Sequence, residues 1–139
     1  MEKTKITVEA LIDAPKEKVW QYFTAPEHIM QWNFADESWQ CPRAENDLKV
    51  GGKYSARMEA KDGSFGFDFD AIYDEVREGE SITYTMGDGR QSTTDFTDVE
   101  GKTMVTTAFD AETMNDIEMQ RGGWQAILNN FKKHAEAQS

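Results

Sequence analysis

The sequence predicts an α+β fold in which an antiparallel sheet of about six to seven strands curves around a long C-terminal helix. Through most of the chain, apolar and polar residues alternate with a period of two, as they do in half-buried strands. Glycine turns separate these segments at intervals of about ten to sixteen residues. The last twenty or so residues instead repeat apolar side chains at the three- and four-residue spacing of one helical face.

The chain begins with a predicted strand whose apolar positions alternate along one face. These positions are Ile6, Val8, Ala10 and Ile12. Asp13-Ala14-Pro15 then begins a helix, because proline at an early helical position loses no hydrogen bond. The expected inner face of this helix consists of Val19, Trp20 and Phe23. Pro26 repeats the signal, so a second, short helix follows, carrying Ile29, Met30 and Trp32.

The middle of the chain is predicted to form the sheet. The clearest strands cover residues 54–60, 65–76, 81–86, 93–97 and 103–110, and another lies near 39–43, where Pro42 indicates an edge or a bulge. Alternation assigns a set of bulky side chains to the inner face. They are Tyr54, Ala56, Met58, Ala60, Phe65, Phe67, Phe69, Ala71, Tyr73, Ile82, Tyr84 and Met86. The opposite parity places Asp68, Asp70 and Asp74 on a solvated face.

The C-terminal helix is predicted over residues 117–137 and should cover the inner face of the sheet. Its apolar stripe consists of Ile117, Trp124, Ile127, Leu128, Phe131 and Ala135. Gly122 and Gly123 interrupt this helix at a cost of roughly 1 kcal/mol each relative to alanine. Two interpretations remain open: close packing of the bare backbone against another element, or room for a ligand beneath the helix.

Length and composition limit the classes of function. The 139 residues fit one domain, and the net charge of -11 argues against nucleic acid or an anionic membrane as a partner. A single cysteine cannot form an intramolecular disulfide, the first residues lack the apolar region of a secretory signal, and no apolar run is long enough for membrane insertion. We therefore expect a cytoplasmic protein.

Four groups of residues, taken together, resemble a known superfamily. They are Asp13-Ala14-Pro15 with Val19-Trp20, Pro26 and Trp32; Leu48-Lys49-Val50-Gly51-Gly52-Lys53-Tyr54; Tyr73-Asp74-Glu75-Val76; and Gly123-Trp124 with Ile127-Leu128. In this order they resemble the START-like (SRPBCC) superfamily, and more narrowly the bacterial homologues of the activator of the heat-shock chaperone ATPase (AHSA1-like). The resemblance implies a single START-like domain over residues 1–139, with a helix-grip fold and a deep, mostly apolar cavity between sheet and helix.

The resemblance leaves the activity open. The superfamily includes lipid carriers, plant hormone receptors, polyketide cyclases and aromatases, and ligand-binding domains of dioxygenases, so its fold does not select one function. The eukaryotic activator also has a separate chaperone-binding domain, for which we expect no room in this sequence. The family name is therefore not expected to describe the activity of this protein.

The residue types that most often carry catalysis or bind metals form no recognisable motif here. His28 and His134 lie outside any ligand-spaced pattern and are predicted to be surface residues, while Cys41 is predicted to be a small buried hydrophobe. Gly51-Gly52 is not followed by the residues of a phosphate-binding loop and is interpreted as a bend or bulge. We predict no catalytic residue, no metal site and no cofactor.

Candidate ligand-binding residues come from the inner faces of the sheet and helices. They are Trp32, Tyr54, Met58, Phe67, Phe69, Tyr73, Tyr84, Arg121, Gly123, Trp124 and Ile127. Arg121 lies beside the helical stripe, where it either forms a salt bridge with a carboxylate of the sheet or first helix or pairs with a polar group of a ligand, and Gln120 adds a hydrogen bond at the same level. The inward tyrosine hydroxyls each need a polar partner from protein, water or ligand.

The sequence favours a non-catalytic module that binds a small hydrophobic or aromatic molecule, such as a lipid, a flavonoid-like or a polyketide-like compound. An enzyme of the cyclase or aromatase type is the alternative, because Tyr73, Tyr84, Arg121 or an inward carboxylate could direct proton transfer without a linear motif. A chaperone-interacting protein is the third class. It requires an exposed apolar patch on the outer face of the sheet, which the row of aspartates opposes on one strand.

Overall fold

The predicted order of elements is confirmed by the computed structural model, which describes residues 4–113 and 116–138. The elements are β1 (Lys5–Ile12), α1 (Lys16–Thr24), α2 (Pro26–Trp32), β2 (Trp39–Asn46), β3 (Lys53–Ala60), β4 (Gly66–Arg77), β5 (Ser81–Met86), β6 (Gln91–Val99), β7 (Lys102–Asp110) and α3 (Ile117–Ala137). The predicted boundaries of β5 and α3 coincide with the observed ones, whereas β2 and β6 extend beyond their predicted ranges. None of the helices in the described ranges is long and apolar enough to cross a membrane.

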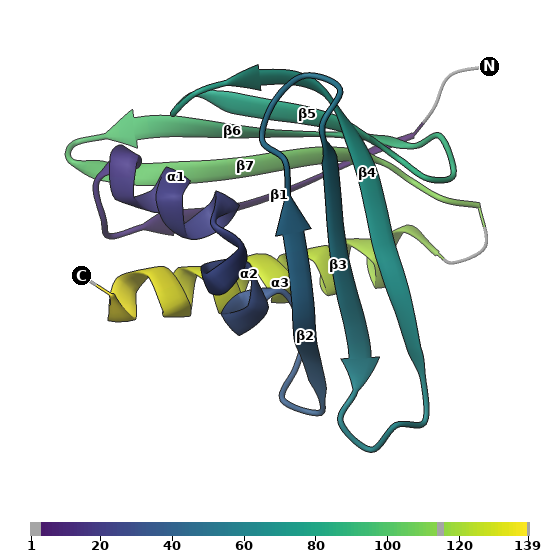
Figure 1. Ribbon diagram of the computed structural model, residues 1–139. Helices are drawn as coiled ribbons and strands as arrows, with labels where there is room; N and C mark the ends of the chain where they lie inside the picture. The colour runs from purple at the N-terminus through teal and green to yellow at the C-terminus, as the bar shows by residue number, and fades with distance from the viewer. Residues whose placement is uncertain (1–3, 114–115, 139) are drawn as a thin grey trace.

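The seven strands form one antiparallel sheet in the order β1-β7-β6-β5-β4-β3-β2. In Figure 1, β2, β3 and β4 run steeply across the direction of β6 and β7, so that the sheet curves around α3. The register shifts in two places, between Gln40 and Arg43 in β2 and between Tyr73 and Glu75 in β4. Such irregularities bend a strand and increase its twist, and the first confirms the prediction of an edge or bulge at Pro42.

The two glycines before β3 form the predicted bend. Gly51 has a positive φ of 83°, and a Cβ on Gly52 would collide with the carbonyl group of Asp47. The Gly51 N–H donates to the Tyr73 carbonyl at 2.8 Å, and the Tyr73 N–H donates to the Gly52 carbonyl at 3.0 Å. This bend therefore holds the β2–β3 connection against β4 beside its irregular register.

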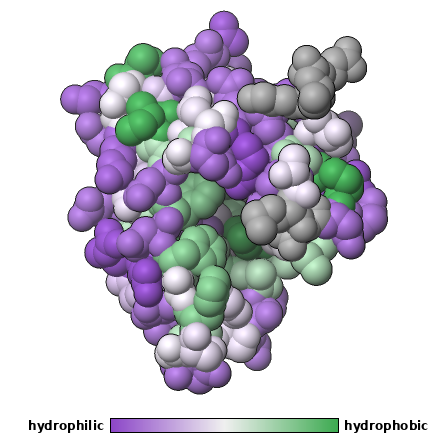
Figure 2. Space-filling model, turned by 90° about the vertical axis from the view of Figure 1, so that its right-hand side faces the viewer, coloured by the Kyte–Doolittle hydropathy of each residue, from purple (hydrophilic) through white to green (hydrophobic). Residues whose placement is uncertain are grey.

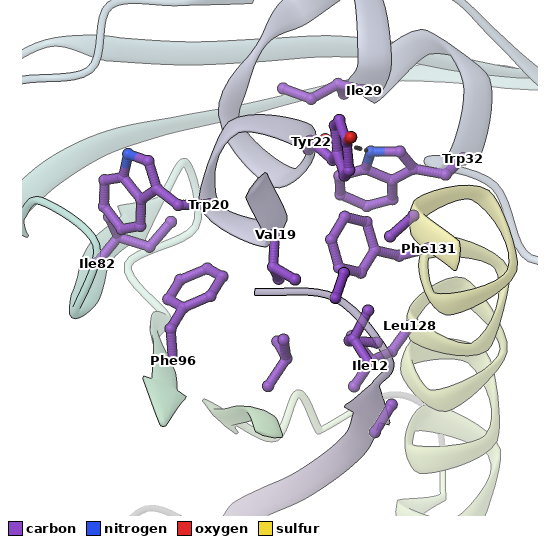
Figure 3. Close-up of a cluster of buried hydrophobic side chains, with 14 of the residues drawn as sticks. Ile12, Val19, Trp20, Tyr22, Ile29, Trp32, Ile82, Phe96, Leu128 and Phe131 are labelled. Carbon is purple, nitrogen blue, oxygen red and sulfur yellow. Dashed lines mark hydrogen bonds between the residues drawn. The ribbon is translucent and has the colours of Figure 1, made fainter. Parts of the chain in front are cut away.

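The main core lies where α1, α2 and the C-terminal half of α3 meet the sheet (Figure 3). Phe131 of α3 is fully buried and contacts Trp32 of α2 edge to face, with ring centroids 4.9 Å apart. Trp32 is fixed in turn, because its indole N–H donates to the Tyr22 carbonyl at 2.9 Å. Burying these large rings locks both short helices against one end of α3.

The outer face of the sheet is polar over β2, β3 and β4, as the aspartate row predicts. Asp68 pairs with Arg43 at 2.8 Å and with Arg57 at 3.7 Å, and Asp70 pairs with Lys53 at 3.9 Å. Ile72 is exposed among these charged groups. A broad apolar patch, which the chaperone hypothesis requires, is not found on this part of the outer face.

Three predicted apolar positions, Phe65, Phe67 and Met30, are less covered than expected, and Phe67 is 41% exposed. Phe65 belongs to the inner-face parity but lies just before β4 and is 62% exposed, because the cover of α3 does not reach the β3–β4 turn. Its neighbours at this end are Trp39 and Phe67, with ring centroids 5.9 and 6.3 Å away. Met30 of α2 points away from the core and is 38% exposed.

The two histidines, which were predicted to be surface residues, are half-buried and contact each other. The Nδ1 atom of His28 in α2 lies 2.9 Å from the Nε2 atom of His134 in α3, and the contact is partly buried. The ring of Tyr22 packs on both imidazoles. Burial, together with electrostatic repulsion by the neighbouring His28, lowers the pKa of His134. A hydrogen bond between two imidazoles requires at least one neutral ring, so the pair joins α2 to α3 only while this condition holds.

The glycines of α3 do not serve close packing. A Cβ added to Gly122 or Gly123 would meet no atom within 4 Å outside the helix's own backbone. The packing interpretation of these two positions is therefore wrong, and both glycines leave open space beside the helix. Farther along α3, the ammonium group of Lys132 donates to the Leu11 carbonyl at 2.6 Å and to Glu136 at 3.0 Å.

We predict that the histidine pair makes stability depend on pH. The unfolded chain binds a proton at His134 with an ordinary pKa near 6.5, whereas the folded chain resists it, so acid favours the unfolded state. The free energy of unfolding should fall as the pH drops below about 6.5, and should do so less steeply for His134→Gln. Urea unfolding at a series of pH values measures both slopes, and parallel slopes would contradict this role.

We also predict that Gly123→Leu stabilises the fold by up to roughly 1 kcal/mol, because leucine has the higher helix propensity and its side chain enters open space. Thermal unfolding measures the change. Lys133→Leu, an exposed position on the same helix, is the control and should alter stability much less. A clear loss of stability in the Gly123 variant would show that another part of the protein packs closely against the helix at this position.

Candidate functional site: a cavity beneath helix α3

Helix α3 is fixed at its N-terminal end by side-chain contacts with its own backbone and with the preceding connection. Asp116 caps the helix, with its carboxylate accepting the Met119 N–H at 2.7 Å. Gln120 is buried and exchanges two hydrogen bonds with the backbone of Glu112, at 2.8 and 3.2 Å. The predicted polar role of Gln120 is therefore structural: it ties the start of α3 to the end of β7.

The apolar stripe of α3 is anchored at two places. Near the N-terminal end, Trp124 stacks on Phe109 of β7, with ring centroids 3.8 Å apart and an angle of 11° between the planes. In the C-terminal half, Leu128, Phe131 and Ala135 are buried in the main core. Between these anchors the helix spans the concave face of the sheet, and the space beneath it is not filled by side chains.

That space is a cavity of about 320 Å³. Figure 2 shows a hollow with hydrophobic walls on the side of the molecule where the β5–β6 turn and the start of α3 lie. Nine of the predicted ligand-binding residues line the cavity. They are Trp32, Tyr54, Met58, Phe67, Phe69, Tyr73, Tyr84, Trp124 and Ile127. Elements β3, β4, β5, α2 and α3 thus contribute to one site.

Four of these residues form an aromatic wall on adjacent strands. Tyr54 and Tyr84 are nearly parallel, with ring centroids 6.0 Å apart, and Phe69 contacts both rings edge to face. Tyr73 lies opposite Tyr84 in the β4–β5 ladder and completes the group at 6.1 Å. Rings in these arrangements attract one another, so the wall is a preformed surface for a flat apolar group.

Two of the three tyrosine hydroxyls in the wall, those of Tyr54 and Tyr73, form hydrogen bonds with asparagine side chains. The Tyr54 oxygen accepts a hydrogen bond from Asn33 Nδ2 at 3.2 Å, and the Tyr73 hydroxyl donates to Asn46 Oδ1 at 2.6 Å. Burial raises the pKa of Tyr54 and of Tyr73 well above the ordinary value. It also raises the pKa of Tyr84 to about 12, against smaller opposite effects of Ser92 and Arg90. All three phenols are therefore neutral at physiological pH.

Nine further lining residues were not predicted as ligand contacts. They are Val8, Phe23, Asn33, Ile82, Arg90, Thr94, Thr107, Glu112 and Leu128. Thr94 and Thr107 face each other on β6 and β7, where their hydroxyls share a hydrogen bond of 2.9 Å. The parity of both strands indicates that these threonines point inward, so alternation could have found them. Asn33, Arg90 and Glu112 lie in connections, where no periodicity identifies a direction.

The cationic group at the cavity is Arg90 and not Arg121. Arg121 forms an ion pair with Glu118, one turn earlier on its own helix, and is absent from the cavity lining. The partners expected from the sequence were a carboxylate of the sheet or first helix, or a ligand, but not a carboxylate of the same helix. A side chain beside the helical stripe can lie along the helix, as Arg121 does, instead of pointing beneath it. Arg90 pairs with Asp88 at 2.7 Å, and its Nη1 donates to the Asp110 carbonyl at 3.4 Å.

The remaining candidates add little chemistry. Gly123 does not line the cavity, although the next residue, Trp124, does. Cys41 is buried as predicted, and burial raises the pKa of its thiol, which makes it a poor nucleophile. Within residues 4–113 and 116–138, no group of three or more histidine, cysteine, aspartate or glutamate side chains could hold a metal ion.

Comparison with known proteins agrees with this architecture. Residues 13–136 match the family described as activator of Hsp90 ATPase homolog 1-like protein. The solution structure of the AHSA1-like protein from Aeromonas hydrophila is 40% identical, with a TM-score of 0.92 over 97% of this chain and 94% of that one. A solution structure from Cytophaga hutchinsonii is 48% identical, with a TM-score of 0.83 over 96% and 93% of the two chains.

More distant structures share the fold alone. A crystal structure from Nitrosomonas europaea is 16% identical, with a TM-score of 0.83 over 97% of this chain and 96% of that one. Among curated proteins, no relative matches the sequence. The family match covers most of the chain, and the START-like architecture agrees with it. The chain belongs to the family of activator of Hsp90 ATPase homologue 1-like proteins.

Proposed function

We propose that the protein binds a small hydrophobic or aromatic molecule in the cavity between the sheet and α3. The observation that carries this proposal is the cavity itself, in which aromatic and aliphatic side chains surround a few polar groups. Pockets for small molecules have this composition, with apolar walls for affinity and a few polar groups for orientation. An unfilled space of this kind is costly to a fold, because the lining side chains lose packing contacts.

The size of the cavity limits the ligand. Its volume of about 320 Å³ lies near the lower end of the range of roughly 300–1,000 Å³ for such pockets. The aromatic wall contributes rings to the cavity from the sheet, and Trp124 contributes an indole ring from the helix. These features favour a compact molecule of a few rings over an extended lipid chain.

The three tyrosines of the cavity favour binding over catalysis of the cyclase or aromatase type. Efficient proton transfer near neutral pH needs a group whose pKa lies close to that pH. The pKa of Tyr84 is raised to about 12, and burial moves Tyr54 and Tyr73 in the same direction. These phenols are suited to donating or accepting hydrogen bonds rather than to giving up protons.

The proposal predicts that filling the cavity weakens binding. Ile127 lines the cavity from α3, so Ile127→Trp should place an indole in the ligand's space and weaken binding of a small aromatic probe by about ten-fold or more, equivalent to about 1.4 kcal/mol. Asn129→Trp adds the same group at an exposed position of the same helix and should have little effect. Heteronuclear NMR titration with a library of small aromatic compounds measures both.

In the unmodified protein, shifts should cluster at Phe69, Tyr84 and Trp124, which line the cavity from the sheet and from α3. Shifts confined to the outer face of the sheet, or equal binding by the two tryptophan variants, would contradict the proposed site. Thermal unfolding of each variant separates a blocked cavity from a damaged fold.

A further inference from the structure

We propose that Tyr54 donates a hydrogen bond to a carbonyl oxygen of the ligand, so that the cavity selects neutral cyclic or aromatic carbonyl compounds over hydrocarbons of the same shape. This inference rests on the proposed binding function and names the chemical group that the site recognises. It depends on which hydrogen bonds the oxygen and the proton of each buried tyrosine hydroxyl already form within the protein.

The Tyr54 hydroxyl is held as a donor. Its side chain is 8% exposed, and its oxygen accepts the hydrogen bond from Asn33, which is equally buried and also lines the cavity. Within the described residues, no hydrogen bond uses the proton of this hydroxyl. Because a phenol with an occupied oxygen donates its proton more strongly, the Asn33 contact both orients and activates the donor.

In the same aromatic wall, the hydroxyl of Tyr73 acts as a donor to the protein itself. Its proton is donated to Asn46 Oδ1 at 2.6 Å, and Asn46 is itself fixed because its Nδ2 donates to the Thr24 carbonyl at 2.6 Å. The amide orientation that satisfies Thr24 leaves only the acceptor oxygen of Asn46 facing Tyr73. The proton of Tyr73 is therefore committed to the protein and is not offered to a ligand.

A neutral acceptor fits the Tyr54 donor better than a charged one. Arg90, which also lines the cavity, is already paired with Asp88 at 2.7 Å. An ionised ligand group would lose its hydration among the aromatic rings around Tyr54, whereas a carbonyl oxygen accepts a hydrogen bond at a much smaller desolvation cost. Tyr54 remains a donor across the physiological range, because burial keeps the phenol protonated. An acceptor-free hydrocarbon would leave this buried donor without a partner, which is the basis of selectivity.

The test compares two probes of one shape, α-tetralone and tetralin, which differ by a carbonyl group in place of a methylene. Their affinities for the unmodified protein, for Tyr54→Phe and for Tyr73→Phe are measured by NMR titration. Tyr54→Phe should lower the affinity of the ketone relative to the hydrocarbon by about five-fold, the effect of one hydrogen bond. Tyr73→Phe removes a hydroxyl from the same wall and should leave this ratio unchanged.

The two proposals fail in different ways. If tetralin and the ketone both bind but the ratio is the same in all three proteins, or falls only in Tyr73→Phe, the role of Tyr54 is overturned while the binding function stands. If neither probe shifts the cavity residues of the unmodified protein, the binding function fails and this inference falls with it.

A second measurement starts from the unmodified protein and so gives a result even where a variant fails to fold. The carbonyl stretching band of bound α-tetralone should lie at lower frequency in the unmodified protein than in an apolar solvent, because a donated hydrogen bond weakens the C=O bond. The band should return toward the solvent value in Tyr54→Phe but not in Tyr73→Phe. A bound ketone whose band matches that in the apolar solvent would also overturn the proposal.

Discussion

The structure depends on how α3 is held: firmly at both ends, and over an unfilled space between them. At one end Phe131 and Ala135 are fully buried against α1, α2 and the sheet. At the other, Trp124 stacks on Phe109, and Gln120 binds the backbone of Glu112. Because these contacts position the helix independently of what lies beneath its middle, the sheet and helix can enclose a cavity without losing a defined fold.

The curvature of the sheet makes this arrangement possible. Irregular register in β2 and β4 and the glycine bend before β3 turn the first three strands after the short helices across the others. Strand parity then directs Tyr54, Tyr73 and Tyr84 from β3, β4 and β5 toward one space. The same parity sends Asp68 and Asp70 outward to basic partners. One periodicity in the sequence thus separates an aromatic site from a charged surface.

Local patterns predicted most of the fold, because alternation, glycine turns and a helical stripe act within a few residues. Tyr54 and Trp124 were found as inner-face residues for this reason, and both line the cavity. The contacts that the sequence analysis did not predict depend on how distant elements pack together. His28 and His134 are 106 residues apart and meet only because α2 docks on α3. Arg90 lies in a turn, and the direction of Arg121 along its helix is not fixed by spacing.

Binding of a small molecule requires a preformed apolar cavity lined by the aromatic wall and Trp124. Diffraction from crystals under xenon pressure tests it directly, because xenon enters apolar cavities without needing a specific ligand. We expect xenon density between Tyr84 and Trp124, with the Trp124–Phe109 stack unchanged. A structure in which Trp124 or Ile127 has moved to fill this space, with no xenon bound there, would show that the folded protein has no preformed cavity.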